Sequence, residues 1–251
     1  MDSMYEILMG LPLFKGVSYK RISEIIEHTK FHFLKYLAGE KVVEAGSECT
    51  HIKFVISGSV RTTIANSDDR FSVSQTLKGP DVIAPDYLFG RATSYPCSAV
   101  ALEPTGILQI EKQEWVRILN SDRVFLFNFL NMLAMNAQRA VDGILAITNG
   151  SLEERIALWV ATMTQRGGTD IVLSCRQRNL YAFFGVQRSS FIATLDDMKS
   201  RGLIDYTSSE IKVASRKDML ELLRSSADDC VVLLQKKKRR VIADGSLCVK
   251  I

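Results

Sequence analysis

Between Phe31 and Ile110 the apolar residues fall in short runs that are rich in β-branched side chains. Glycines separate several of these runs at points where the chain must turn, as at Gly39, Gly46, Gly58 and Gly79. Many short strands divided by glycines predict a small antiparallel β-roll of the jelly-roll type. The predicted strands are Val42–Val43, Ile52–Ile56, Val60–Ile64, Phe71–Leu77, Ser98–Leu102 and Ile107–Ile110. Residues 5–30 show helical spacing, interrupted at Gly10–Phe14.

From Glu111 onward the apolar spacing becomes helical. One stripe repeats in alternating steps of four and three, which is the heptad spacing of two helices that wind around each other. We therefore predict a long helix that pairs with its copy in a parallel dimer. Phe125, Phe129 and Met132 form a second face that can pack on the roll, whereas the alternative is that the stripe itself packs there. The stripe consists of Leu126, Leu130, Leu133, Ala137, Ala140, Ile144 and Ile147.

A third segment begins at Ser151, which forms a capping box with Glu154 and predicts a helix that ends at Gly167–Gly168. Up to about Leu223 the pattern then predicts two further helices and a hairpin. Ser174 is the predicted N-cap of the first of these two helices, which should bury Leu180, Ala182 and Phe183.

Gly185 supplies a tight left-handed turn before a second helix. That helix begins near Gln187 and buries Phe191, Leu195 and Met198, and the strands Leu203–Tyr206 and Ile211–Val213 follow it as a wing. A helix, a glycine turn and a second helix are the arrangement that places the second helix in the major groove of DNA.

The exposed positions at the start of the second helix are the candidates for contact with bases. They are Gln187, Arg188, Ser189 and Ser190, and Arg188 can bind guanine O6 and N7 in a bidentate manner. Arg176, Arg178, Lys199 and Arg201 flank the helix and can hold phosphates. The alternative is a winged helix that contacts only protein, with these cations merely solvated.

The patterns together predict an α+β protein with a roll at residues 1–120, a dimerisation helix at 121–149 and a winged helix-turn-helix at 150–225. Residues 226–251 form a tail without an assigned role. The formal net charge of +4 permits a nucleic-acid partner without requiring one. No signal peptide or membrane-spanning stretch is evident, so we expect a cytoplasmic protein.

The residues that carry chemistry are sparse. Five dispersed cysteines without a C-x-x-C pair argue against a disulfide framework or a cluster of metal ligands. A β-roll can also be a metal-dependent cupin enzyme, but the chain has only His28, His32 and His51, and only His51 falls in a predicted strand. We therefore expect no enzyme activity, no cofactor and no metal site.

The sequence resembles the Crp/Fnr family of bacterial transcription regulators over roughly residues 5–223. The resemblance rests on Gly39–Glu40, Gly46, Val55–Val60 and Gly79 in the roll, and on Gly185–Ser190 and Gly202–Ile204 near the carboxyl end. It implies a homodimer that binds double-stranded DNA, with an effector site in the roll and RNA polymerase as a further candidate partner. Ala193 stands where many members carry a second base-reading arginine.

The effector pocket is where the sequence departs from that family. Cyclic-nucleotide-binding members have a Gly-Glu pair that holds the ribose and an Arg-Ser pair that neutralises the phosphate. Ile83–Ala84 and Tyr95–Pro96 occupy the corresponding positions here, which argues against cyclic AMP because a buried phosphate would lack its partner. A regulator that responds to a cyclic nucleotide through an atypical pocket remains the alternative. The predicted effector pocket comprises Ile83, Ala84, Tyr87, Arg91, Tyr95 and Pro96.

Overall fold

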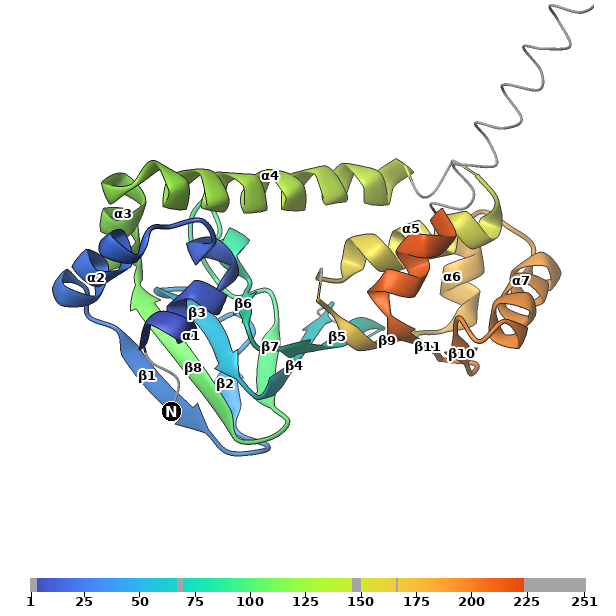
Figure 1. Ribbon diagram of the computed structural model, residues 1–251. Coiled ribbons are helices and arrows are strands. Elements are labelled where there is room, and N and C mark those ends of the chain that lie inside the picture. The colour runs from blue at the N-terminus through green and yellow to red at the C-terminus, as the bar shows by residue number, and fades with distance from the viewer. Residues whose placement is uncertain (1–3, 67–69, 146–149, 166, 224–251) are drawn as a thin grey trace, which may run out of the picture.

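The computed structural model describes residues 4–66, 70–145, 150–165 and 167–223, and Figure 1 shows their arrangement. The chain is an α+β protein with an antiparallel roll at its N-terminal end, as the sequence predicts. The roll strands are β1 (His32–Tyr36), β2 (Lys41–Val43), β3 (His51–Ser57), β4 (Ser59–Ala65), β5 (Phe71–Lys78), β6 (Asp81–Ile83), β7 (Ser98–Ala101) and β8 (Thr105–Glu111). Among the described residues, no helix is both long and apolar enough to cross a membrane.

The helices before the roll close one end of it. They are α1 (Met4–Gly10), the 3-10 turn η1 (Pro12–Phe14) and α2 (Tyr19–His28), whose first turn is capped by Ser18. Phe14 from η1 is buried and meets the Phe54 ring edge-on at 6.1 Å between centroids. The break that the sequence predicts at Gly10–Phe14 therefore directs a large aromatic side chain into the core.

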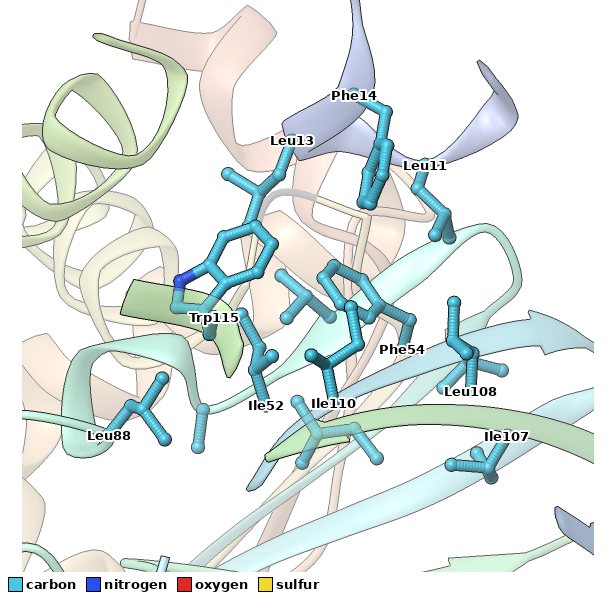
Figure 2. Close-up of a cluster of buried hydrophobic side chains, with 14 of the residues drawn as sticks. Leu11, Leu13, Phe14, Ile52, Phe54, Leu88, Ile107, Leu108, Ile110 and Trp115 are labelled. Carbon is cyan, nitrogen blue, oxygen red and sulfur yellow. The ribbon is translucent and has the colours of Figure 1, made fainter. Parts of the chain in front are cut away.

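The roll core is a cluster of aromatic and aliphatic side chains (Figure 2). Trp115 comes from α3 (Lys112–Ser121) and lies 6.0 Å from the Phe54 ring, centroid to centroid. Alternate residues of β3, such as Ile52 and Phe54, point into this core, which is the period-2 pattern of a strand with one buried face. Burial of such large apolar side chains is the dominant favourable term in folding.

The long helix α4 (Arg123–Leu145) packs on the roll through one face and leaves the other face open. Phe125 and Phe129 are buried, and their rings lie 5.0 Å from Phe14 and 5.8 Å from Trp115. Met132 packs beside them. The predicted packing face of this helix is therefore confirmed.

The C-terminal part has its own core. Its elements are α5 (Leu152–Met163), β9 (Thr169–Cys175), α6 (Gln177–Phe183), α7 (Arg188–Ser200), β10 (Asp205–Tyr206) and β11 (Glu210–Ser215), with residues 216–223 helical. The capping box of Ser151 and Glu154 is present at the start of α5, as predicted. The core combines Trp159 and Val160 of α5 with Leu173 of β9 and Phe191 of α7.

Strand β9 corrects the sequence interpretation of this region. Ser174 lies inside β9 and caps no helix, since α6 starts at Gln177 with Arg176 as its N-cap residue. The residues that α6 and its C-cap bury are Leu180 and Phe184, whereas Phe183 is 42% exposed. Thr169, Asp170 and Ser174 are polar residues near the two ends of this short strand, and serine is also a frequent N-cap residue.

Two sheets organise the strands. One has the order β1-β8-β3-β6, and the other has the order β10-β11-β9-β5-β4-β7-β2. The second sheet runs from the roll into the C-terminal part, because β5 pairs with β9 in an antiparallel ladder. Figure 1 shows β4, β5, β9 and β11 as one continuous layer below α4.

Candidate functional site

The turn between α6 and α7 is built as the sequence predicts. Gly185 has φ +64°, and its N–H donates to the Ala182 carbonyl at 3.1 Å. Only glycine adopts this left-handed conformation without a steric cost. Phe191, Leu195 and Met198 of α7 are buried. The turn therefore fixes α7 against the second core with its opposite face toward solvent.

The first turn of α7 is exposed. Gln187 is the N-cap residue, and Gln187, Arg188, Ser189 and Ser190 are all exposed. These residues lie at the amino end of the helix, where the backbone N–H groups have no partners within the helix and the helix dipole favours negative charge. The predicted base-reading residues thus form one accessible surface.

A surface hollow of about 440 Å³ adjoins the start of α7 and brings three arginines together. The β10–β11 turn forms one wall, because the Gln177 N–H donates to the Ser208 carbonyl and the Cys175 N–H donates to the Ser209 carbonyl. Guanidinium groups and serine hydroxyls are the donors that bind phosphate oxygens. The lining residues are Arg176, Gln177, Arg178, Tyr181, Arg188, Ser208 and Ser209.

Sequence reasoning missed the wing side of this hollow. Ser208 and Ser209 belong to a polar turn, Thr207–Ser209, between the two predicted wing strands. The run of polar residues was therefore visible in the sequence, but only the fold shows that this turn is hydrogen-bonded to the start of α6. The Gln177 side chain completes the link by donating from Nε2 to the Thr207 carbonyl at 2.9 Å.

Arg201 pairs with Glu153 and Asp197 outside the hollow, and Lys199 does not join this group either. Its Nζ lies 2.7 Å from Asp205 Oδ1 and 5.6 Å from the centroid of the Tyr206 ring, at the base of the wing. The hydrogen bond from Lys199 lowers the pKa of the Asp205 carboxyl. In this structure Lys199 therefore bridges α7 to β10, and it lies at the opposite end of α7 from Arg188.

The predicted effector residues are divided between the core and the surface of the roll. Ile83, Ala84 and Tyr95 are buried in the roll core, whereas Tyr87 and Arg91 are exposed. Pro96 is half-buried. The Tyr95 hydroxyl donates to the His51 carbonyl at 2.9 Å, and burial raises the pKa of this phenol. Tyr95 is thus a packed core residue with a satisfied hydroxyl group.

Backbone geometry refines the comparison with a Gly-Glu pair. Ala84 has φ +43°, a conformation that favours glycine, and Pro85 follows it at the start of a 3-10 turn. The geometry therefore matches Ala84–Pro85 to that pair more closely than Ile83–Ala84. Neither Ala84 nor Pro85 carries a carboxylate that could accept a ribose hydroxyl.

Two cysteines lie near Tyr95. Burial raises the pKa of the Cys49 thiol, and it raises that of Cys97 to about 11. Both thiols are therefore protonated at neutral pH and poorly reactive. His32 and His51 both lie in strands, with rings 6.4 Å apart, which corrects the expectation that only His51 would do so. Among the described residues, no group of three or more histidine, cysteine, aspartate or glutamate side chains could hold a metal ion.

The predicted dimer stripe lies mostly on the open face of α4. Leu126 and Leu130 are exposed, and so are Ala137 and Ala140. Leu133 differs, because it is half-buried and packs against the roll core. The side chain of Ile144 and all of Ile147 lie outside the described residues, as does the tail at 226–251.

Comparison with known proteins identifies the roll. Residues 33–122 match the family model of the cyclic nucleotide-binding domain. The roll is therefore similar to that domain. The match covers β1 to α3 and leaves α4 and the winged helix outside it. No curated protein matches the chain.

Solved structures that are similar to this chain include transcription regulators. The catabolite activator protein of Thermus thermophilus is 18% identical with a TM-score of 0.47, covering 84% of this chain and 97% of its own. FixK2 of Bradyrhizobium japonicum is 17% identical with a TM-score of 0.43, covering 77% and 97%. DNR of Pseudomonas aeruginosa is 17% identical with a TM-score of 0.41, covering 85% and 95%. Because these scores are below 0.5, the function proposed next rests on the residues of this chain.

Proposed function

We propose that the chain is a homodimeric, sequence-specific DNA-binding transcription regulator of the Crp/Fnr type, controlled by an effector or a partner that acts on the cyclic nucleotide-binding domain. The observation that carries the proposal is the exposed first turn of α7 beside an arginine-lined hollow. Protein–DNA interfaces need both a helix that reads base edges and cations that hold the flanking phosphates.

The first turn of α7 and the arginines at the start of α6 have separate tasks. Arg188 projects from the first turn of α7, where a helix in the major groove meets base edges. Arg176 and Arg178 lie at the start of α6 and face the wing turn across the hollow. They are placed to hold phosphates beside the groove, which fixes orientation and contributes most of the salt dependence. The open apolar stripe of α4 supplies the pairing of two copies.

The test is selection of duplexes from a random library by the full-length protein, followed by titration of the Arg188→Ala variant. We expect Arg188→Ala to reduce discrimination between the selected and a scrambled duplex by about 1–3 kcal/mol, because one bidentate base contact is lost. The control is Arg117→Ala on α3, a 70% exposed arginine remote from α7, which removes the same charge. Equal affinity of the unmodified protein for selected and scrambled duplexes would contradict the proposal.

A second candidate function is a response to a cyclic nucleotide, which the family match of residues 33–122 favours. We expect titration calorimetry with cyclic AMP and with cyclic GMP to show no binding. The reason is that Ala84 and Pro85 offer no ribose acceptor and Tyr95–Pro96 offers no cation for the phosphate. Micromolar binding of either nucleotide would show that other residues form the pocket.

A further inference from the structure

The junction between the cyclic nucleotide-binding domain and the winged helix is a strand pairing. Strand β9 of the winged helix adds to the edge of β5, with Ser72 opposite Ser174 and Val73 opposite Leu173. The β9 strand also pairs with β11 on its other side. The wing, β9 and the β4–β5 hairpin are therefore parts of one hydrogen-bonded sheet.

Side chains of β5 belong to the core of the winged helix. Val73 is buried in that core, and the Phe71 ring lies 5.6 Å from the Trp159 ring of α5, centroid to centroid. An incidental contact between two modules would not place a residue of one module in the hydrophobic core of the other. The β4–β5 hairpin thus completes the winged helix as well as the roll.

A bulge in the ladder directs one buried side chain across the junction. Ser74 pairs with Val172 and Thr76 pairs with Thr169, so Gln75 faces two residues, Asp170 and Ile171. Asp170 accommodates the extra residue with φ +47°. Bulges of this kind redirect side chains and set register.

Gln75 uses this position to hold the loop that precedes β9. Its side chain is 5% exposed, and its Oε1 accepts the backbone N–H of Gln165 at 2.8 Å. A Cβ atom added at Gly168 would overlap Gln75 Oε1 and would lie 3.1 Å from the Gln165 carbonyl oxygen. Position 168 therefore admits only glycine while Gln75 keeps this hydrogen bond.

We propose that Gln75 and Gly168 are positioning residues that fix the winged helix on the β4–β5 hairpin, so that β5 sets where α7 stands relative to the cyclic nucleotide-binding domain. The consequence for DNA binding rests on the function proposed above. In a dimer, the two α7 helices must keep a fixed spacing to occupy both halves of a symmetric site. A loose junction would still let each winged helix bind its own half of the site. It would remove the gain in affinity that comes from binding both halves at once.

The first arm of the test is hydrogen exchange of the full chain, measured by mass spectrometry without DNA. Gly168→Val and Gln75→Met should each raise exchange of residues 71–76 and 169–175 at least tenfold, because local opening of the β5–β9 ladder becomes easier. Strands β3 and β8 should keep their protection. The control is Gln165→Ala, since only the backbone of Gln165 makes the bond to Gln75. Unchanged exchange, or loss of protection throughout the chain, would overturn the proposal.

The second arm uses the selected duplex and a duplex that carries only one of its halves. Gly168→Val should bind the full duplex at least tenfold more weakly and the half duplex within about twofold of the unmodified protein. Unchanged affinity for the full duplex despite faster exchange would overturn the positioning role. If selection yields no duplex at all, the DNA-binding function fails, and the exchange measurement alone then decides whether these residues hold the junction.

Discussion

Leu130→Lys is expected to convert the protein from a dimer to a monomer and to reduce its affinity for a symmetric duplex about 10²- to 10⁴-fold. Leu130 is the second residue of the predicted stripe on α4 and is 48% exposed in the single chain. Burial of an unpaired lysine ammonium in an apolar dimer interface costs far more free energy than the burial of Leu130 contributes. In a dimer, binding of one winged helix gives the other a high effective concentration at the second half-site. A monomer lacks this effect.

Sedimentation velocity over a range of concentrations measures the change in mass, and titration of the selected duplex measures the change in affinity. The matched control is Val116→Lys on α3, an exposed apolar residue outside the stripe, which adds the same charge. Leu130 is preferable to Leu133, because Leu133 packs against the roll core and its replacement would also disturb the roll. A dimer that survives Leu130→Lys would show that two chains do not pair through this face.

The sequence was sufficient to predict the elements whose patterns are local. The β-branched runs of the roll appear as strands, for example Val60–Ile64 within β4 and Phe71–Leu77 within β5. Gly185 and the buried residues of α7 are also as predicted, since a tight turn and a helical apolar face depend on residues close together in the chain.

Strand β9 could not be read in the same way, because its environment comes from distant residues. It lies between β11 and β5, and β5 lies about a hundred residues earlier in the sequence. Its inward positions Ile171 and Leu173 were visible, but nothing local showed that a β-roll strand would cover its open edge. The same long-range pairing explains why the bulge at Gln75 and the need for glycine at position 168 were not predicted.

The candidate site was predictable in part. The first turn of α7 follows from the helix-turn-helix pattern, and Arg176 lines the same hollow as Arg188. The sequence shows that Lys199 is a cation close to this helix, but its ion pair with Asp205 depends on the path of the wing. The effector residues are predicted from the positions of family motifs, and the packing of the roll separates them into core and surface positions.

Asp81→Asn is expected to stabilise the protein at neutral pH by about 3 kcal/mol. Asp81 begins β6, where its Oδ1 accepts the Val82 N–H at 2.7 Å. The loop before β9 covers the carboxyl group, since a Cβ atom added at Gly167 would lie 3.1 Å from Asp81 Oδ2. Burial raises the pKa of Asp81 to about 6, and the Val82 hydrogen bond opposes this effect. A shift of about two units corresponds to about 3 kcal/mol.

The sign follows from the linkage between protonation and folding. A carboxyl group whose pKa is higher in the folded state favours folding when protonated, so its full penalty is present above about pH 6 and disappears below the unfolded value of 3.8. The gain from Asp81→Asn should therefore be largest at pH 7.5 and fall to roughly half of that at pH 5. Urea unfolding of the variant and of the unmodified protein at both pH values measures this difference in the free energy of unfolding.

Glu27→Gln on α2 is the control for Asp81→Asn, because it removes the same charge from an exposed position and should change stability little at either pH. Asparagine keeps an oxygen that can accept the Val82 N–H, so the substitution tests the buried charge and not this hydrogen bond. A gain that does not depend on pH would mean that improved packing, and not removal of a buried carboxylate, stabilises the variant. Because the carboxyl group lies against the loop between α5 and β9, hydrogen exchange should show the added protection in β6 and β9 together.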